Sequence, residues 1–278
     1  MKRRPFRFVL LVTYVLAVLL CLFCVFPLVW SILTSLKTPE DVYAMPLHVV
    51  PHPFTLQNYS DVLFSSVQMR FFLNSTIVSL LTTLVSTTVA VLAAYGFSRF
   101  RFPGGATLFG TILFSRILPR VTLLIPFYVV LARLHLINTK GGLVLVYLII
   151  AMPITVWMLR GFVDTMPVEI EEAARVDGCG PYGILFRIVV PVLAPAIAAI
   201  AMFAFILSWN EFLFPLLITK DLASRTISVG LAFFIDESGV KWGPLMAASV
   251  LMGLPPIVAF SYAQKYVVRG LSEGAVKG

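Results

Sequence analysis

The chain begins with a long stretch that holds no charged side chain, residues 8–36, FVLLVTYVLAVLLCLFCVFPLVWSILTSL. A helix needs about 20 apolar residues to cross a bilayer, whereas the apolar core of a signal peptide has only about 7–15. No cleavage site of the A-x-A type follows the stretch. It therefore predicts a first membrane-spanning helix that is retained.

The composition extends this interpretation to the whole chain. Of its 278 residues, 59% are hydrophobic and only 12% are charged, whereas soluble domains carry roughly a quarter of charged residues. The outside of the folded chain must therefore face hydrocarbon. The net charge of +8 comes from short basic clusters between apolar runs. Such clusters indicate membrane topology rather than a nucleic-acid surface.

The apolar runs predict an all-α integral membrane protein with six transmembrane helices in a single domain, residues 1–278. A charged segment, residues 166–187, separates the fourth run from the fifth. The predicted spans are about 8–36, 71–98, 106–132, 141–159, 188–214 and 243–263.

The basic residues predict the orientation, because loops on the cytoplasmic side carry an excess of Lys and Arg. With both termini inside, the inner side receives Lys2, Arg3, Arg4, Arg7, Arg99, Arg101, Arg160, Arg175, Arg187, Lys265, Arg269 and Lys277. The outer side receives fewer, namely Lys37, Arg70, Arg133, Lys140, Lys220, Arg225 and Lys241. The segment between spans four and five then lies in the cytoplasm.

That segment contains residues 169–191, EIEEAARVDGCGPYGILFRIVVP. Pro167 suits a first helical turn, and Gly178 suits the end of a helix. Acidic residues near the start favour the positive end of the helix dipole. Ile170, Ala173 and Ala174 are spaced to share one face, where two alanines would let another protein approach closely. A helix that lies on lipid would instead carry Lys or Arg and bulky apolar anchors, so we favour a protein docking helix.

The spacing of this segment resembles the cytoplasmic loop of ABC-importer permeases. That loop reads E-A-A, three residues, Gly, nine residues, Ile, one residue and Leu-Pro. Here the pattern is matched by Glu172-Ala173-Ala174, Gly178, Ile188 and Pro191, with Val190 in place of Leu.

Further elements resemble the carbohydrate branch of that family, of the maltose or polyol type. They are Trp209-Asn210-Glu211-Phe212, Ile117-Leu118-Pro119, Leu124-Ile125-Pro126, Asn138-Thr139, and the tail from Gln264 to Gly278.

The resemblance implies a permease subunit of an ATP-driven importer in a bacterial or archaeal cell membrane. It would work with a second homologous permease, two ATPase subunits and an external solute-binding protein, and would move a sugar, polyol or sugar phosphate. ATP and Mg²⁺ would bind the partner ATPase, and this chain would bind no cofactor of its own. The residues expected to couple to the ATPase are Glu171, Glu172, Ala173, Ala174, Asp177 and Gly178.

Charges inside the predicted membrane form a second candidate site. Arg116 lies about 15 Å into the third run and Arg120 follows one turn later. Because an arginine at this depth is costly, both should face protein or water, with Glu211 as the acidic candidate partner. They either brace the helices or line the translocation path together with Asn210.

Enzyme chemistry is not expected of this chain. The sequence has no G-x-x-x-x-G-K-[ST] loop, and Cys21, Cys24, His48, His52 and His135 form no metal-ligand pattern, so we expect no catalytic or metal site. The competing hypothesis is a transporter or channel that an ion gradient drives without an ATPase. This hypothesis gives the Glu172 segment no role, and Glu211 is the only intramembrane carboxylate that the sequence predicts.

Overall fold

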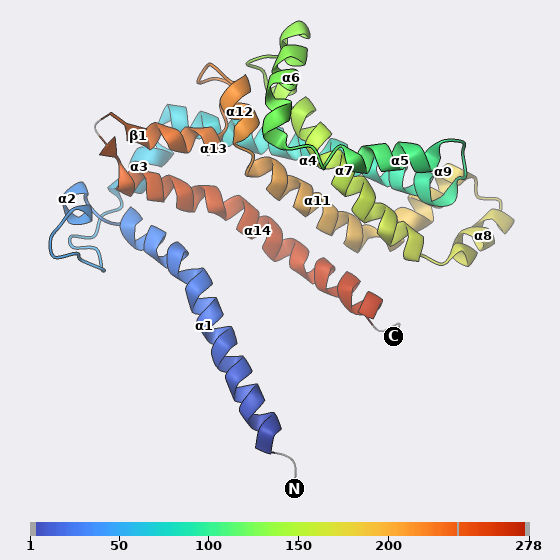
Figure 1. The fold of residues 1–278 in the computed structure, drawn as a ribbon, viewed down its shortest axis with the longest axis horizontal. Coiled ribbons are helices and arrows are strands. Elements are labelled where there is room, and N and C mark those ends of the chain that lie inside the picture. The colour runs from blue at the N-terminus through green and yellow to red at the C-terminus, as the bar shows by residue number, and fades with distance from the viewer. Residues whose placement is uncertain (1–3, 238, 276–278) are drawn as a thin grey trace. The chain divides into compact units, whose positions relative to one another are not determined.

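A computed structural model describes residues 4–237 and 239–275, and these are mostly helical (Figure 1). The helices are α1 (Arg4–Ser35), α2 (Pro39–Val42), α3 (Gln57–Leu63), α4 (Ser66–Arg99), α5 (Gly105–Phe114), α6 (Arg120–Arg133), α7 (Lys140–Thr165), α8 (Val168–Val176), α9 (Pro181–Ile184), α10 (Val190–Val192), α11 (Ala194–Trp209), α12 (Leu213–Ile218), α13 (Ile227–Gly230) and α14 (Trp242–Ala275). A π-helical turn, η1 (Leu185–Val189), joins α9 to α10, and a 3-10 turn, η2 (Leu231–Phe234), follows α13. Strands β1 (Ile235–Asp236) and β2 (Gly239–Val240) pair antiparallel, with Ile235 opposite Val240.

Four helical segments are long and apolar enough to cross a bilayer: Val9–Ser35, Ser66–Arg99, Lys140–Thr165 and Trp242–Gln264. A fifth span results if Pro181–Val192 and Ala194–Trp209, which meet at 78°, are one broken span. The chain is thus a multi-pass helical membrane protein. The count of six spans and the positions of the termini stay predictions.

The third predicted run, 106–132, is not one continuous helix. It is divided into α5, of 10 residues, and α6, of 14 residues, and each is shorter than a bilayer requires. Residues 115–119 between them carry Arg116 and end in Pro119, whose extended backbone precedes α6. Because proline has no N–H to donate, it ends one helix and suits the start of the next.

The chain divides into two compact units, and each is described by itself. The first comprises residues 1–69 and 231–253. In it, Asn58 donates hydrogen bonds to the carbonyls of Ser35 (2.9 Å) and Lys37 (2.8 Å). A Cβ at Gly243 would lie 2.6 Å from the Asn58 amide, so this close approach requires glycine. Val62, Ala247 and Ala248 form its small core.

Helix α1 packs differently from the rest of this unit. None of the apolar window in Val9–Ser35 is buried within the chain. Its length and apolar composition alone identify it as a candidate span.

The second unit comprises residues 70–230 and 254–278. Helices α7 and α11 pack along each other, and α12 lies against α6 and α7. One buried cluster joins α4, α7, α8 and α11 through Ala94, Leu159, Ala174 and Ile200. A second cluster surrounds Tyr147 and Phe214.

The Asn138-Thr139 pair has a structural role in this unit. The Asn138 carboxamide oxygen accepts the backbone N–H groups of Lys220 and Asp221, both at 3.0 Å, and Thr139 caps α7 by accepting the N–H of Gly142. The turn between α6 and α7 is thereby fixed to the loop after α12.

Candidate functional site

The charged segment forms a short helix, α8, that follows directly on α7 (Figure 1). Glu169 and Glu171 occupy its first turn and Arg175 its last, an order that favours both ends of the helix dipole. The helix ends in a Schellman motif, since Gly178 N–H bonds to Arg175 (3.0 Å) and Cys179 N–H to Ala174 (2.9 Å). Gly178 has a φ of +84°, which explains the glycine at this position.

The inner face of α8 is held by a buried ion pair. The Glu171 side chain is fully buried and accepts a hydrogen bond from Arg99 Nε at 2.6 Å and from the Tyr95 hydroxyl at 3.0 Å. Arg99 also donates to the carbonyls of Val163 (2.9 Å) and Met166 (3.0 Å). One guanidinium thus ties the ends of α4 and α7 to α8. A buried ion pair supported by further hydrogen bonds from both partners fixes the orientation of the helix.

The outer face of α8 is exposed. It carries Glu169, Glu172, Ala173 and Val176, which recur at i, i+3, i+4 and i+7. The Val176 side chain is 88% exposed. A row of two carboxylates, one methyl group and one isopropyl group is therefore presented away from the core.

The predicted coupling residues are divided between these two faces. Glu171 and Ala174 point inward, while Glu172, Ala173, Asp177 and Gly178 are exposed. The expected face of Ile170, Ala173 and Ala174 is not a single surface, because Ala174 is buried in the cluster that also contains Ile184 and Leu159. Successive residues lie about 100° apart around a helix axis, so Ala174 can be buried while Ala173 is exposed. Only the exposed members can contact another protein directly in this structure.

The second candidate site lies at two helix breaks. Arg120, the first residue of α6, places Nη1 3.2 Å from Glu211 Oε2, in the break between α11 and α12. The other Glu211 oxygen accepts the N–H of Leu213 at 3.1 Å, so the carboxylate also caps α12. The expected Arg–Glu contact is therefore present for Arg120.

Arg116 and Asn210 do not join this contact. Asn210 donates to the Ile206 carbonyl of its own helix at 3.0 Å. Arg116 is exposed between α5 and α6, and no ion pair to it occurs among the residues that the structure describes. Of the four residues predicted for this site, the structure brings Arg120 and Glu211 together.

Sequence reasoning missed the partners of Glu171. The sequence places Arg99 only among the basic residues that predict the inner side of the membrane. It lies 72 residues from Glu171 along the chain. The available signal was weak: a tyrosine and an arginine one turn apart, at the end of an otherwise uncharged run.

His48 and His52 belong to the first unit. His48 bonds to Asp41 at 2.7 Å in the loop after α1. Within residues 4–237 and 239–275, no group of three or more His, Cys, Asp or Glu side chains is arranged to hold a metal ion.

The chain is a multi-pass helical membrane protein in which a short charged helix, α8, is held to the ends of two long helices. The chain belongs to the family described as the binding-protein-dependent transport system inner membrane component, whose model matches residues 86–273. Together with its relatives, this places the chain among the permeases of carbohydrate ABC importers.

Curated relatives match nearly the whole chain. The sulfoquinovosyl glycerol transport system permease protein SmoH of Agrobacterium fabrum is 35% identical over 91% of this chain and 89% of its own length. The trehalose/maltose transport system permease protein MalG of Thermococcus litoralis is 35% identical over 94% and 95%. The diacetylchitobiose uptake system permease protein DasC of Streptomyces coelicolor is 32% identical over 95% and 96%.

Solved structures share the fold. A bacterial ABC transporter involved in the import of the acidic polysaccharide alginate matches with a TM-score of 0.83 and 20% identity, over 96% of this chain and 99% of that chain. A bacterial alginate ABC transporter in complex with an alginate pentasaccharide-bound periplasmic protein matches with a TM-score of 0.69 and 14% identity, over 94% and 93%.

Proposed function

We propose that this permease carries a saccharide or a related glycosidic solute across the membrane and is driven by a separate ATPase that docks on the outer face of α8. The sugar class is supported by relatives whose names specify sulfoquinovosyl glycerol, trehalose or maltose, and diacetylchitobiose. The observation that carries the coupling role is the construction of α8, which has a buried ionic anchor on one face and an exposed acidic row on the other.

This construction suits the transmission of force. A helix that only lay on the surface could move without the membrane helices. In contrast, α8 is held to the ends of α4 and α7 through Arg99 and Glu171. A displacement of α8 by the ATPase would therefore move two long membrane helices as well. Rigid-body movement of this kind is a common form of switching.

The remaining partners follow from the same proposal. A second permease would complete the translocation path, two ATPase subunits would bind ATP and Mg²⁺, and an external binding protein would deliver the solute. The broken spans at Arg120 and Glu211 suit a path between two permeases, because irregular backbone at membrane depth is tolerated where it lines a cavity or lies within protein. Family membership favours this importer over a transporter that an ion gradient drives.

The test is co-purification of the ATPase with variants of the exposed row. Glu172→Lys should reduce the bound ATPase about tenfold or more. The introduced positive charge would be repelled by a basic surface of the ATPase that the Glu172 carboxylate had contacted. Glu40→Lys, an exposed reversal outside this segment, is the matched control. Equal recovery of the ATPase with both variants would contradict the proposal.

Gly178 gives a second variant pair. No atom lies within 4 Å of the place where its Cβ would be, so only the positive φ requires glycine. Asparagine tolerates this conformation better than alanine. We expect Gly178→Asn to retain more of the bound ATPase than Gly178→Ala if the shape of the helix end matters. The reverse order would indicate that side-chain bulk at this position blocks docking.

A further inference from the structure

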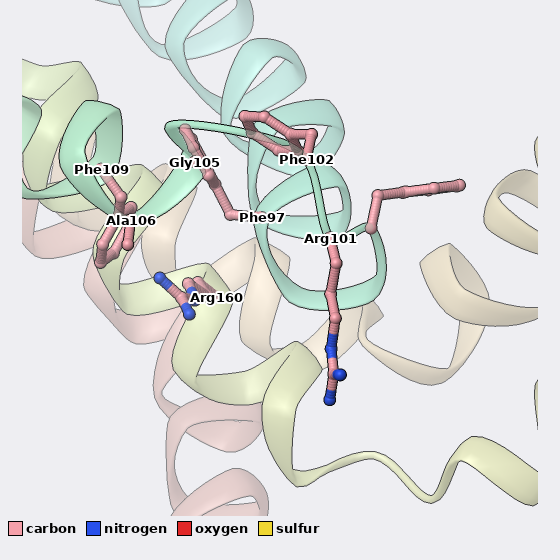
Figure 2. A pocket seen from close by; sticks show the side chains of 8 residues that line it. Phe97, Arg101, Phe102, Gly105, Ala106, Phe109 and Arg160 are labelled. Carbon is pink, nitrogen blue, oxygen red and sulfur yellow. The ribbon is translucent and has the colours of Figure 1, made fainter.

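A hollow of about 370 Å³ opens where α4 ends and α5 begins (Figure 2). It is lined by aromatic rings and two arginines, from residues Phe97, Phe100, Arg101, Phe102, Gly105, Ala106, Phe109 and Arg160. None of these residues is part of the coupling row or of the two helix breaks. The hollow therefore needs an explanation of its own.

Its aromatic wall is continuous. The Phe97 ring centroid lies 5.8 Å from that of Phe102 and 5.2 Å from that of Phe109. A Cβ at Gly105 would lie 3.1 Å from the Phe102 ring, so glycine lets the turn close against it. The wall offers a firm apolar surface to a flexible chain.

The hollow has an excess of positive charge. The Arg160 guanidinium lies over Phe109, 4.3 Å from the ring centroid, as Figure 2 shows. Its Nε forms an ion pair with the Asp164 carboxylate at 3.5 Å, although it makes no hydrogen bond. Arg101 forms no ion pair within the described part of the chain. Asp164, which also accepts from the Ser98 hydroxyl, does not line the hollow.

The position of the hollow defines what can fill it. It lies at the end of α4, a helix that is long and apolar enough to span a membrane, and its lining includes Phe97 from the last turn of that helix. If α4 spans the bilayer, the hollow is near the lipid head groups. The first turn of α5 has no side-chain cap, and the positive end of its helix dipole adds partial positive charge. A membrane phospholipid matches both features of the hollow, because its apolar chain can contact the rings and its phosphate can contact the guanidinium groups.

We propose that this hollow binds an anionic membrane phospholipid, with its phosphate between Arg101 and Arg160 and an acyl or isoprenoid chain along Phe97, Phe102 and Phe109. Arg160 is held over its ring by a cation–π contact and is therefore pre-positioned. The bound lipid would sit between the ends of α4 and α7, next to the anchor of α8. This proposal does not depend on the identity of the transported solute or on ATPase docking.

The test uses the full-length chain in nanodiscs of phosphatidylcholine that contain a photoactivatable phosphatidylglycerol. Crosslinked peptides are identified by mass spectrometry. We expect crosslinks on residues 97–109 and a decrease of about fivefold for each of Arg101→Gln and Arg160→Gln, the usual contribution of one basic residue near an anionic surface. Arg187→Gln removes an exposed charge outside the hollow and is the matched control.

Two further arms keep the test decisive. Ala106→Trp fills the hollow without a change of charge and should abolish the crosslinks while the protein stays in the nanodisc. Free inorganic phosphate at millimolar concentration should not displace the lipid, because it lacks the chain that contacts the rings. Displacement by phosphate, an equal loss with Arg187→Gln, or equal crosslinking by a photoactivatable phosphatidylcholine would each overturn the proposal.

Discussion

At the residue scale, the pair of Glu171 and Arg99 determines how α8 is held. The Glu171 side chain is 0% exposed and that of Arg99 is 8% exposed, so each charge depends on the other. Removal of one partner leaves the second buried without compensation, which is more harmful than loss of both.

We therefore predict that Glu171→Gln lowers the free energy of unfolding by about 3–5 kcal/mol. The double variant Arg99→Gln with Glu171→Gln should be less destabilised than Glu171→Gln alone, because no charge is then left unpaired. Thermal unfolding of the purified protein measures both. Glu172→Gln, on the exposed face, is the control and should stay close to the parent; a loss as large as that of Glu171→Gln would show that burial is not the cause.

Asp41 gives a prediction about pH outside the membrane. The backbone N–H of His52 donates to its carboxylate at 2.9 Å and the His48 ring contacts it at 2.7 Å; with Lys37 nearby, these groups hold the pKa of Asp41 below its ordinary value. A lowered pKa means that the ionised carboxylate stabilises the folded loop at pH values above about 4, and that this contribution is lost as the pH falls through the lowered pKa.

The measurement is the hydrogen-exchange protection of the His52 N–H, corrected for the intrinsic rate at each pH. Protection should decline below about pH 4 in the parent chain and should be low at every pH in Asp41→Ala. Protection in the parent that does not change with pH would show that the carboxylate does not hold the loop.

At the element scale, the break between α11 and α12 depends on Glu211 in two ways, as partner of Arg120 and as acceptor for the Leu213 N–H. The Arg120 side chain is 45% exposed, so solvent screening reduces the value of the ion pair. We infer that the cap matters more than the charge.

Glu211→Gln keeps an acceptor oxygen and should cost no more than about 1 kcal/mol, whereas Glu211→Leu also leaves the Leu213 N–H without its partner and should cost about 1–3 kcal/mol more. Unfolding of the two variants in the same detergent checks this order. Equal destabilisation would mean that the ion pair, and not the cap, stabilises the break.

How far the sequence predicts these elements depends on the element. The apolar runs 71–98, 141–159 and 243–263 fall within α4, α7 and α14, and the run 8–36 lies in α1 except for its last residue, because length and hydropathy suffice to define a continuous span. The runs 106–132 and 188–214, which contain polar groups at depth, are each predicted to form a single helix. The structure instead breaks the first near Pro119 and bends the second at Leu193. Hydropathy averages over a window and does not register where backbone hydrogen bonds are interrupted.

The candidate site divides in the same way. The pattern around Glu172 and Gly178 located α8 and its end, since local spacing defines a helix and its cap. The inward turn of Glu171 depends on Arg99 and Tyr95 from a distant helix, and no local pattern encodes it. The residues of the tail at 276–278, which also matched the carbohydrate branch, lie outside the described residues.

At the scale of the whole molecule, the proposed coupling requires the acidic row of α8 to lie on the cytoplasmic side of the membrane. The basic residues predict this side, and Val176, which is 88% exposed, offers a reporter in the row itself. The native cysteines to be replaced are Cys21, Cys24 and Cys179.

The most direct measurement is labelling of Val176→Cys, in a chain without other cysteines, by a membrane-impermeant thiol reagent in vesicles of both orientations. The account predicts labelling only in inside-out vesicles, and protection when the ATPase is bound. Labelling in right-side-out vesicles would place α8 on the exterior, where no ATP-driven subunit could reach it, and would contradict the central claim.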